Sequence, residues 1–507
     1  MTVVYHLSKT KTAYKPKKAH NSKYSDTLLQ ANRETKKMRT HSPTAAASAL
    51  LSLVCVFSLC LFASSSSSIT PKTSGITIPI SPLFTKHPYS DPIKTLNSLA
   101  SASLIRASHL KRPKSPSHLP KIQVFPHGYG GYSISLSFGT PPQTIPFVLD
   151  TGSSLTWFPC TSRYLCANCV SPSVDKILKF IPRLSSSSKL LGCQNPKCAS
   201  YFGPDVQSRC QDCSPASQNC SQSCPPYVIQ YGLGSTAGLF LSEALDFPEK
   251  TFPDFLVGCS IFSTGIPVGN AGFGRGSESL PSQLGLSRFS YCLLSRRFDD
   301  TMESSDLVLY GGSGSTKTPG LSYTPFRKNP VSNDTAFREF YYVTLRKVIV
   351  GDRTAKIPYK FLVPGADGHG GTIVDSGTTF TFMERPVFDA VAKEFVTQMA
   401  NYTRAVDIEA QSGLGPCFNI GGKKIVIPDL TFQFKGGAKL TLPLGNYFAF
   451  VRDSSVVCLT ITTDDVLGSG PSSGPAIIFG SFQQQNFYVE YDLESERLGF
   501  RQQSCKK

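Results

Sequence analysis

The sequence contains few charged residues for its length and little tryptophan or methionine. Charged residues make up 17% of its 507 residues and hydrophobic residues 40%, with 1 Trp and 5 Met. That balance excludes both a disordered chain and a protein with many membrane spans. By contrast, the 40 Gly and 37 Pro are typical of many turns and short strands. An all-β fold is therefore expected, in one large domain or two lobes.

Acidic charge is scarce only near the start of the chain. The formal net charge is +17, yet residues 126–507 hold 33 basic and 31 acidic residues. Most of the net positive charge comes from residues 1–37 and 64–125, because basic residues there are almost unopposed by acidic ones. Because the bulk of the chain is nearly neutral, nucleic-acid binding through a basic surface is excluded as its main function. No nucleic-acid partner is expected.

One apolar run, residues 45–63, carries no charge and is followed by serines. Its densest part has the length of a signal-peptide core and is short for a bilayer span. Met38 and Arg39 stand just upstream, so we expect residues 1–37 to be a gene-model extension and residues 38–63 a signal peptide of a secreted protein. The alternative is that the basic tail is real and the run is an uncleaved signal anchor, the one case that predicts a membrane partner.

The chain has 16 Cys, of which Cys55 and Cys60 lie in the apolar run. The other 14 are an even number, which fits disulfides in an oxidising compartment. Two Cys-x-x-Cys pairs can also be read as zinc ligands, but secretion favours disulfides, so no metal is expected. The candidates are Cys160, Cys166, Cys169, Cys193, Cys198, Cys210, Cys213, Cys220, Cys224, Cys259, Cys292, Cys417, Cys458 and Cys505.

Nine of these cysteines crowd between residues 160 and 224. An odd number there requires one partner outside the stretch, and Cys259 is the nearest. Cys417 could also pair with Cys458 and Cys292 with Cys505, while the connectivity of the other cysteines is left open. Three N-glycosylation triplets, which begin at Asn219, Asn333 and Asn401, also indicate a secreted protein.

The chain repeats one motif. Residues 147–158 read FVLDTGSSLTWF and residues 373–383 read IVDSGTTFTFM. Each motif is followed by a second segment ending in Gly: AGFGRG at residues 271–276, where we align Gly274, and AIIFG, ending at Gly480. The repetition predicts two halves related by pseudo-two-fold symmetry.

Each copy of the motif is expected to be a buried strand that ends in a tight turn. Gly152 and Gly377 permit backbone geometry and close approach that a Cβ would block. The hydroxyls of Ser153 and Thr378 can hydrogen-bond the neighbouring carboxylate. A lone Asp-Thr-Gly would be an ordinary turn, whereas two matching copies indicate a pair of functional carboxylates.

With these motifs, residues 128–507 resemble the pepsin-like aspartic endopeptidases, and within them the atypical plant nepenthesin-like group. The resemblance rests on DTGSS at residues 150–154, DSGTT at 375–379, YGLGSTAG at 231–238, the Cys-rich insert and the C-terminal FGSFQQQNFYVEYDLESERLGF at 479–500. It implies an all-β, bilobal pepsin-like fold with a few short helices. Residues 126–320 would form the N-terminal lobe, with the flap and the insert, and residues 321–507 the C-terminal lobe.

The resemblance implies that Asp150 and Asp375 form the catalytic dyad. Two close carboxylates cannot both ionise cheaply, so they share a proton. One would act as general base on a water and the other would polarise the scissile carbonyl. The resemblance further implies that Thr151 and Ser376 grip each other beneath the dyad, with support from Gly152, Ser153, Gly377 and Thr378.

The resemblance also identifies Tyr231 and Gly232 as part of a flap that closes over substrate, with Trp157 hydrogen-bonded to the flap tyrosine. Leu233 departs from the Asp or Thr usual at its flap position. A separate segment, residues 386–399, places Val387, Val391 and Phe395 on one face and is expected to be the main helix.

Residues 64–125 are rich in Ser and Pro, basic, and interpreted as a propeptide. We expect Lys114 or Lys121 to contact the dyad at neutral pH and to be released by acid; the alternative is a disordered linker.

These features predict a secreted endopeptidase that cleaves polypeptides at acid pH and is inhibited by pepstatin-like compounds. We expect a monomer without cofactor, in the apoplast or cell wall, with the vacuole also compatible. The alternative is a catalytically silent relative that binds or inhibits another secreted protein, as xylanase-inhibitor proteins of this fold do.

Overall fold

The computed structural model describes most of the chain after residue 74. Nothing in the predicted extension and signal peptide lies within the described residues. The described ranges are 75–82, 91–111, 131–169, 177–203, 206–210, 220–231, 234–265, 267–295, 304–312, 316–330, 335–421, 426–451, 453–464 and 474–506.

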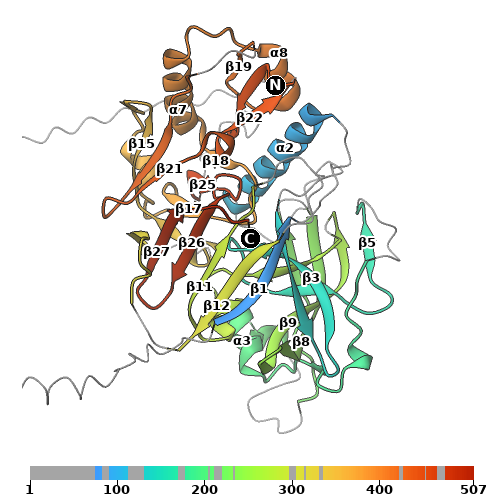
Figure 1. The fold of residues 1–507 in the computed structure, drawn as a ribbon. Helices are drawn as coiled ribbons and strands as arrows, with labels where there is room; N and C mark the ends of the chain where they lie inside the picture. Colours follow the sequence, from blue (N-terminus) through green and yellow to red (C-terminus); the bar gives the residue numbers. More distant parts are fainter. Residues whose placement is uncertain are drawn as a thin grey trace, which may run out of the picture. The chain divides into compact units, whose positions relative to one another are not determined.

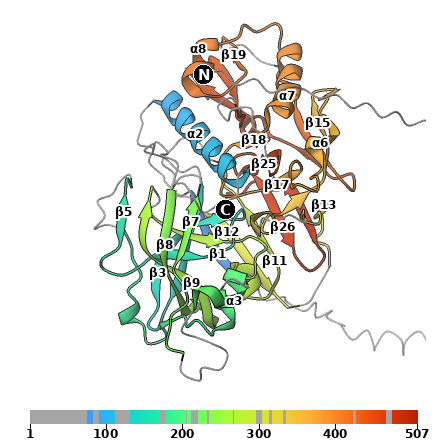
Figure 2. The ribbon, with the colours of Figure 1, turned by 180° about the vertical axis from the view of Figure 1, so that it is seen from behind.

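Most described elements are strands (Figures 1 and 2). Fifteen of them form one sheet, with the order β13-β27-β26-β11-β12-β1-β2-β3-β10-β4-β9-β8-β6, while β5 pairs with β9 and β7 with β8. Their bounds are β1 Gly75–Pro82, β2 Tyr132–Phe138, β3 Gln143–Asp150, β4 Trp157–Pro159, β5 Leu165–Ala167, β6 Lys189–Leu190, β7 Tyr227–Tyr231, β8 Gly234–Phe247, β9 Lys250–Thr264, β10 Gly269–Gly272, β11 Leu286–Cys292, β12 Ser305–Gly311, β13 Ser322–Pro325, β26 Phe487–Asp492 and β27 Arg497–Gln502.

The C-terminal half adds three smaller sheets. The first, in spatial order, is β14 Tyr342–Val343, β17 Thr372–Val374, β25 Ile477–Phe479, β18 Thr381–Met383 and β24 Ile461–Thr462. The second is β16 Arg353–Thr354, β15 Leu345–Val350, β20 Leu430–Phe434 and β21 Lys439–Thr441. The third is β19 Cys417–Asn419, β23 Val456–Leu459 and β22 Phe448–Val451.

Strand β2 illustrates how the sequence specifies these sheets. It reads YSISLSF, and its burial alternates with a period of two. Apolar side chains such as Ile134 and Leu136 enter the core, whereas the serines between them do not. Because successive strand residues face opposite sides of a sheet, this alternation buries one face of the strand. The mostly β architecture therefore agrees with the expected fold class.

The helices correct one expectation. Helix α7, Arg385–Gln398, forms where the sequence predicts it and buries Val387, Val391 and Phe395. However, α2, Pro92–Lys111, is longer, with 20 residues, so α7 is not the main helix. The remaining helices are short: α3 Pro196–Phe202, α4 Val206–Arg209, α5 Leu280–Gln283, α6 Tyr359–Leu362, α8 Val406–Ser412 and the 3-10 turns η2 Pro182–Leu184, η4 Thr335–Arg338 and η5 Leu444–Asn446.

Helix α2 lies within the predicted propeptide and is docked rather than isolated. Its residues Leu96, Leu99 and Ala100 pack in one apolar cluster with Phe380. About two and three turns further on, Ala107 and Leu110 pack in a second cluster that contains Ile478. Both views show α2, in blue, beside α8 and β18, with which it is in contact (Figures 1 and 2). Spacing of these apolar residues by three and four is why the segment forms an amphipathic helix.

The predicted propeptide also contributes β1. This strand lies between β12 and β2 in the large sheet, and its Ile78 and Ile80 are buried in the main core. Residues 75–82 and 91–111 of the predicted propeptide are therefore integral to the described fold. They do not form a linker.

Candidate active site

The two motif loops are built in the same way at the ends of equivalent strands. Asp150 ends β3, which pairs in parallel with β10 so that Gly272 lies opposite Asp150. Asp375 follows β17, which pairs in parallel with β25, and the Asp375 N–H donates to the Phe479 carbonyl oxygen. Gly480 follows Phe479 and is therefore the counterpart of Gly272. Our alignment of Gly274 with Gly480 is wrong by two residues, because AGFGRG contains three glycines and only strand register selects among them.

Close approach explains the glycines at these positions. A Cβ on Gly272 would collide with the Ser154 carbonyl oxygen, and one on Gly480 with the equivalent Thr379 oxygen. A Cβ on Gly152 would lie 2.6 Å from Asp375 Oδ1. The mirrored position, Gly377, would place its Cβ 2.5 Å from Asp150 Oδ1. Only a residue without Cβ lets the two loops meet.

Beneath the carboxylates, Thr151 and Ser376 bond across the two halves. The Thr151 N–H donates to Ser376 Oγ at 3.1 Å, and the Ser376 N–H donates to Thr151 Oγ1 at 2.9 Å. Each hydroxyl then donates to a strand of the opposite half, Ser376 to the Leu149 oxygen at 2.8 Å and Thr151 to the Val374 oxygen at 3.3 Å. This arrangement holds the two loops at a fixed separation, and both side chains are buried.

Each carboxylate is supported by its own loop. Gly152 N–H and Ser153 Oγ donate to Asp150 at 2.9 and 2.7 Å. In the other half, Gly377 N–H and Thr378 Oγ1 donate to Asp375 at 2.9 and 2.6 Å. The structure thus brings together every residue that the sequence predicts for the dyad and its support. The arrangement places two buried, oriented carboxylates face to face, which suits shared-proton chemistry.

Arg106 of α2 bridges the two carboxylates. Its Nη2 lies 2.6 Å from Asp150 Oδ1 and its Nε 3.3 Å from Asp375 Oδ2. Lys114 and Lys121, the expected contacts, lie outside the described residues. The signal that could have identified Arg106 is its position in a helical apolar pattern, between Ser103 and Leu110 on the buried face.

The bridge changes the proton affinity of its members. Burial raises the pKa of Asp150 above the ordinary aspartate range; the charge of Arg106 opposes that rise and the charge of Asp375 adds to it. Burial alone would lower the pKa of Arg106, but the two carboxylates outweigh it and raise that pKa above normal. With α2 in place, the guanidinium supplies the charge balance that a shared proton would otherwise supply.

Further polar contacts hold α2 on the C-terminal half. Lys111 forms an ion pair with Glu384, and both side chains are almost fully buried. His369 Nε2 lies 3.1 Å from both oxygens of the same carboxylate. Earlier in the helix, Ser103 Oγ accepts a 2.8 Å hydrogen bond from the Phe380 N–H. The helix that covers the dyad is therefore anchored by charge as well as by apolar packing.

Known proteins are similar to this chain in sequence and in fold. Two family models match, "Xylanase inhibitor N-terminal" over residues 132–309 and "Xylanase inhibitor C-terminal" over residues 340–502. Among curated proteins, a probable aspartyl protease of Arabidopsis thaliana is 32% identical over 424 residues, which cover 74% of this chain and 82% of the relative. Aspartic proteinase nepenthesin-2 of Nepenthes gracilis is 33% identical over 386 residues, 75% of this chain and 78% of the relative.

The chain belongs to the nepenthesin-like group of atypical aspartic proteases. Solved structures agree on the fold. The crystal structure of edgp matches with a TM-score of 0.58 at 18% identity, covering 85% of this chain and 96% of that one. Basic 7S globulin from soybean matches with a TM-score of 0.55 at 17% identity and the same coverage.

The segment that the sequence predicts to be a flap lies in the hairpin of β7 and β8 in this nepenthesin-like chain. Tyr231 ends β7 and pairs with Gly234, while Gly232 and Leu233 lie outside the described residues. Trp157 Nε1 donates to the Tyr231 hydroxyl at 2.8 Å, which is the contact that the resemblance implies. Burial, with the charge of Asp150, raises the pKa of Tyr231, so the hydroxyl stays protonated. The ring of His109, on α2, lies 6.4 Å from the Tyr231 ring.

Disulfides join the cysteines that the structure of this nepenthesin-like chain describes. Cys160 pairs with Cys259, the partner expected from outside the Cys-rich stretch. The two later pairs also form, Cys292–Cys505 and Cys417–Cys458. Inside the insert the bonds are Cys166–Cys169, Cys193–Cys210 and Cys198–Cys224; Cys220 is disulfide-bonded, and Cys213 lies outside the described residues.

Other predicted sites are only partly visible. Asn401 is exposed, as a glycosylation acceptor must be, whereas Asn219 and Asn333 lie outside the described residues. Among the residues that the structure describes, no group of three or more His, Cys, Asp or Glu is arranged to hold a metal. Within those same ranges, no helix is long and apolar enough to cross a membrane.

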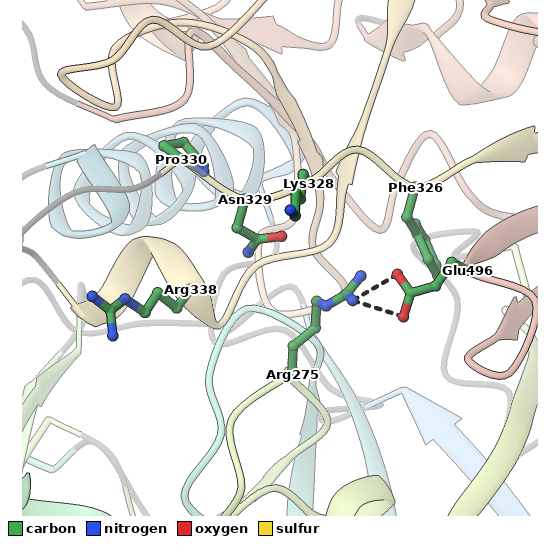
Figure 3. A pocket seen from close by; sticks show the side chains of 7 residues that line it. All are labelled: Arg275, Phe326, Lys328, Asn329, Pro330, Arg338 and Glu496. Carbon is green, nitrogen blue, oxygen red and sulfur yellow. Dashed lines mark hydrogen bonds and ion pairs between the residues drawn. The ribbon is translucent and has the colours of Figure 1, made fainter.

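An open pocket of about 600 Å³ is lined by Arg275, Glu496 and five further residues (Figure 3). Arg275 crosses it and donates to both oxygens of Glu496 at 2.9 and 2.7 Å. The Arg275 N–H donates to the Glu339 carbonyl oxygen, and the preceding Gly274 N–H donates to Ser153. The ion pair therefore ties the turn behind the Asp150 loop to the turn between β26 and β27. Neither Asp150 nor Asp375 lines this pocket.

Proposed function

We propose that this protein is a secreted aspartic endopeptidase that hydrolyses polypeptides at acid pH. The observation that carries the proposal is the completeness of the dyad: both carboxylates, their supporting donors and the crosswise grip are present in both halves. The relatives named as aspartic proteases support the same activity. The predicted signal peptide, the disulfides and the exposed Asn401 support a secreted enzyme.

In the proposed reaction, one carboxylate is ionised and the other protonated. The ionised one takes a proton from a water molecule as that water attacks the peptide carbonyl, while the protonated one donates to the carbonyl oxygen. The resulting tetrahedral diol collapses when a proton passes to the leaving nitrogen, and no covalent enzyme intermediate forms. Tyr231, on the flap, would close over the substrate and limit access of bulk water.

The described chain would be the latent precursor of this enzyme. Arg106 occupies the space between the carboxylates, so a substrate carbonyl could not approach them. Acid would weaken this hold, because protonation of Asp150 and Asp375 removes the charges that Arg106 binds. Removal of residues 64–125 would then uncover the dyad. Pepstatin-like inhibitors are expected to bind the uncovered site, and we expect the enzyme to act as a monomer.

The test uses the full-length secreted chain, incubated at about pH 4, the acid range in which such a dyad keeps one proton. We expect pepstatin-sensitive cleavage of a denatured protein by the wild type. Asp150→Asn and Asp375→Asn should each lower the rate by about a thousandfold or more, since general acid and base are both lost or mismatched. The exposed Asp389→Asn is the matched control and should keep full activity.

Latency is tested by Arg106→Met, which removes the bridging charge but keeps an apolar side chain of similar length. The variant precursor should open at a higher pH than the wild type and process itself near neutrality. Unchanged latency would show that Arg106 does not hold the helix closed.

The competing function is binding of another secreted protein without catalysis. The family models carry the name of xylanase inhibitors, which favours this alternative. A wild-type protein that loses residues 64–125 and still cleaves nothing would support it and would reject the protease proposal.

A further inference from the structure

The two halves of the dyad differ at one residue behind the support hydroxyls. Strand register places Asn270 two residues before Gly272 and Ile478 two residues before Gly480. Gly272 and Gly480 occupy the same place beside the two carboxylates, so Asn270 and Ile478 are structural counterparts. Asn270 is 5% exposed and Ile478 fully buried. A buried amide therefore stands where the symmetry of the fold places an aliphatic side chain.

The Asn270 amide hydrogen-bonds the serine that supports Asp150. Its Nδ2 donates to Ser153 Oγ at 2.9 Å, and Ser153 Oγ donates to Asp150 Oδ2 at 2.7 Å. A serine hydroxyl has one hydrogen and two lone pairs. With the amide N–H directed at its oxygen, the hydroxyl hydrogen is directed at Asp150. The two bonds form a relay of donors that ends on one carboxylate oxygen.

In the other half, the chain of donors behind the carboxylate has one member fewer. Thr378 Oγ1 donates to Asp375 Oδ2 at 2.6 Å, but the aliphatic side chain of Ile478 has no donor to place behind it. Donors in series polarise each other and strengthen the final bond. A hydrogen bond to a carboxylate favours its charged form. The relay therefore stabilises charge on Asp150 more than the single hydroxyl stabilises charge on Asp375.

The relay does not depend on the covering helix. Arg106 bonds Asp150 through Oδ1, whereas Ser153 bonds Oδ2. Asn270 and Ser153 lie in the N-terminal half, and neither hydrogen bond of the relay involves a residue of α2. The asymmetry is therefore carried into the uncovered enzyme.

We propose that Asn270 is a positioning residue that, through Ser153, directs the shared proton of the dyad to Asp375 and leaves Asp150 as the general base. This assignment rests on the proposed protease function and sharpens it, since it gives each carboxylate a separate role. The Asn270 side chain is distinct from the catalytic residues, because it acts on Asp150 only through the serine hydroxyl.

The first experiment measures the pH profile of kcat/KM for the acid-activated enzyme. In Asn270→Leu the donor is lost and the size is kept, so the acid limb should move to higher pH by about half a unit. Asn270→Asp is isosteric but replaces the donor by an acceptor, and it should move the limb in the same direction. The control Ile478→Leu, a volume-conserving change in the other half, should leave the limb in place.

The second experiment needs no catalysis. In the full-length chain, a hydrogen bond that favours charged Asp150 contributes stability at neutral pH and loses it as Asp150 takes up a proton. The Tm of Asn270→Leu should therefore lie below that of the wild type at pH 7, and the difference should shrink on acidification.

The two readouts separate the possible failures. A Tm deficit that is the same at every pH, or an unmoved acid limb, would reduce Asn270 to a packing residue and overturn the proposal. If the wild type has no activity at any pH, the protease function fails. A Tm deficit that narrows on acidification would still support the Asn270 relay in that case.

Discussion

The Asp150 loop and the Asp375 loop make the same direct contacts to their carboxylates, but they differ in the residue behind those contacts. In both, a glycine lets the opposite carboxylate approach, a Ser or Thr hydroxyl supports the carboxylate, and a second hydroxyl grips the other half. The difference lies one layer further out, where Asn270 stands in one half and Ile478 in the other. Symmetry thus positions the two groups, and an asymmetric neighbour can give them different tasks.

The covering helix is also unequal in its contacts. Lys111 and Ser103 bind Glu384 and Phe380 of the C-terminal half, and the apolar face of α2 packs on clusters that contain residues of that half. Arg106 is the contact that reaches Asp150 of the other half. Helix α2 is therefore docked mainly on the C-terminal half, and Arg106 and His109 extend from it toward Asp150 and Tyr231 of the other half.

The largest loss of stability is expected at Gly272 and Gly480, the glycines packed against the two motif loops. In Gly272→Ala and Gly480→Ala, the new Cβ collides with the backbone oxygen of Ser154 or Thr379, which cannot move like a side chain. Each variant should lose at least about 3 kcal/mol of stability, measured by chemical unfolding of the full chain. Gly445→Ala, with open space around its Cβ position, is the control. If only one of the two variants is destabilised, the halves are not equivalent at this layer.

A smaller effect is expected from the crosswise grip. Thr151→Val and Ser376→Ala each remove a hydroxyl that accepts a buried N–H of the other half. An unsatisfied buried donor costs about 1–3 kcal/mol, so the two variants should be destabilised by similar amounts. Their double variant should cost less than the sum, because the two hydroxyls act in one network. Additive costs in the unfolding measurement would show that the two bonds are independent.

The smallest effect concerns a carboxylate behind the Asp150 loop. Burial, and then the charge of Glu278, raises the pKa of Glu339, which Ser154 partly counters by hydrogen bonding. A carboxyl with a raised pKa in the folded state favours folding at low pH and loses that contribution as pH rises through the raised pKa. Glu339→Gln should therefore weaken the pH dependence of Tm and raise Tm at pH 8 by about 2 °C. An unchanged pH dependence of Tm would contradict the assigned pKa direction.

Local sequence was sufficient for the parts of the site that lie within one turn. Gly152, Ser153 and their counterparts act on the Asp a few residues away, so the repeated motif predicts their place. Of the two glycines behind the loops, the sequence identified Gly480 but not Gly272. Strand register, and not composition, distinguishes Gly272 from Gly274. Asn270 could not be predicted for the same reason, since it lies just before the AGFGRG segment and only tertiary structure places its amide beside Ser153.

Arg106 shows the opposite limit. Eight basic residues lie between residues 64 and 125, and charge alone does not say which one reaches the carboxylates. The choice depends on which face of α2 is apolar and on where that face docks, and thus on contacts with residues such as Phe380 and Ile478 far along the chain.

The sequence by itself determined the family, the two carboxylates and their immediate support, because these follow from short motifs whose geometry is local. The tertiary structure decided which cation covers the dyad and which hydroxyl has a donor behind it. Both depend on the packing of segments that are distant in sequence, and packing sets distances and burial that no motif contains.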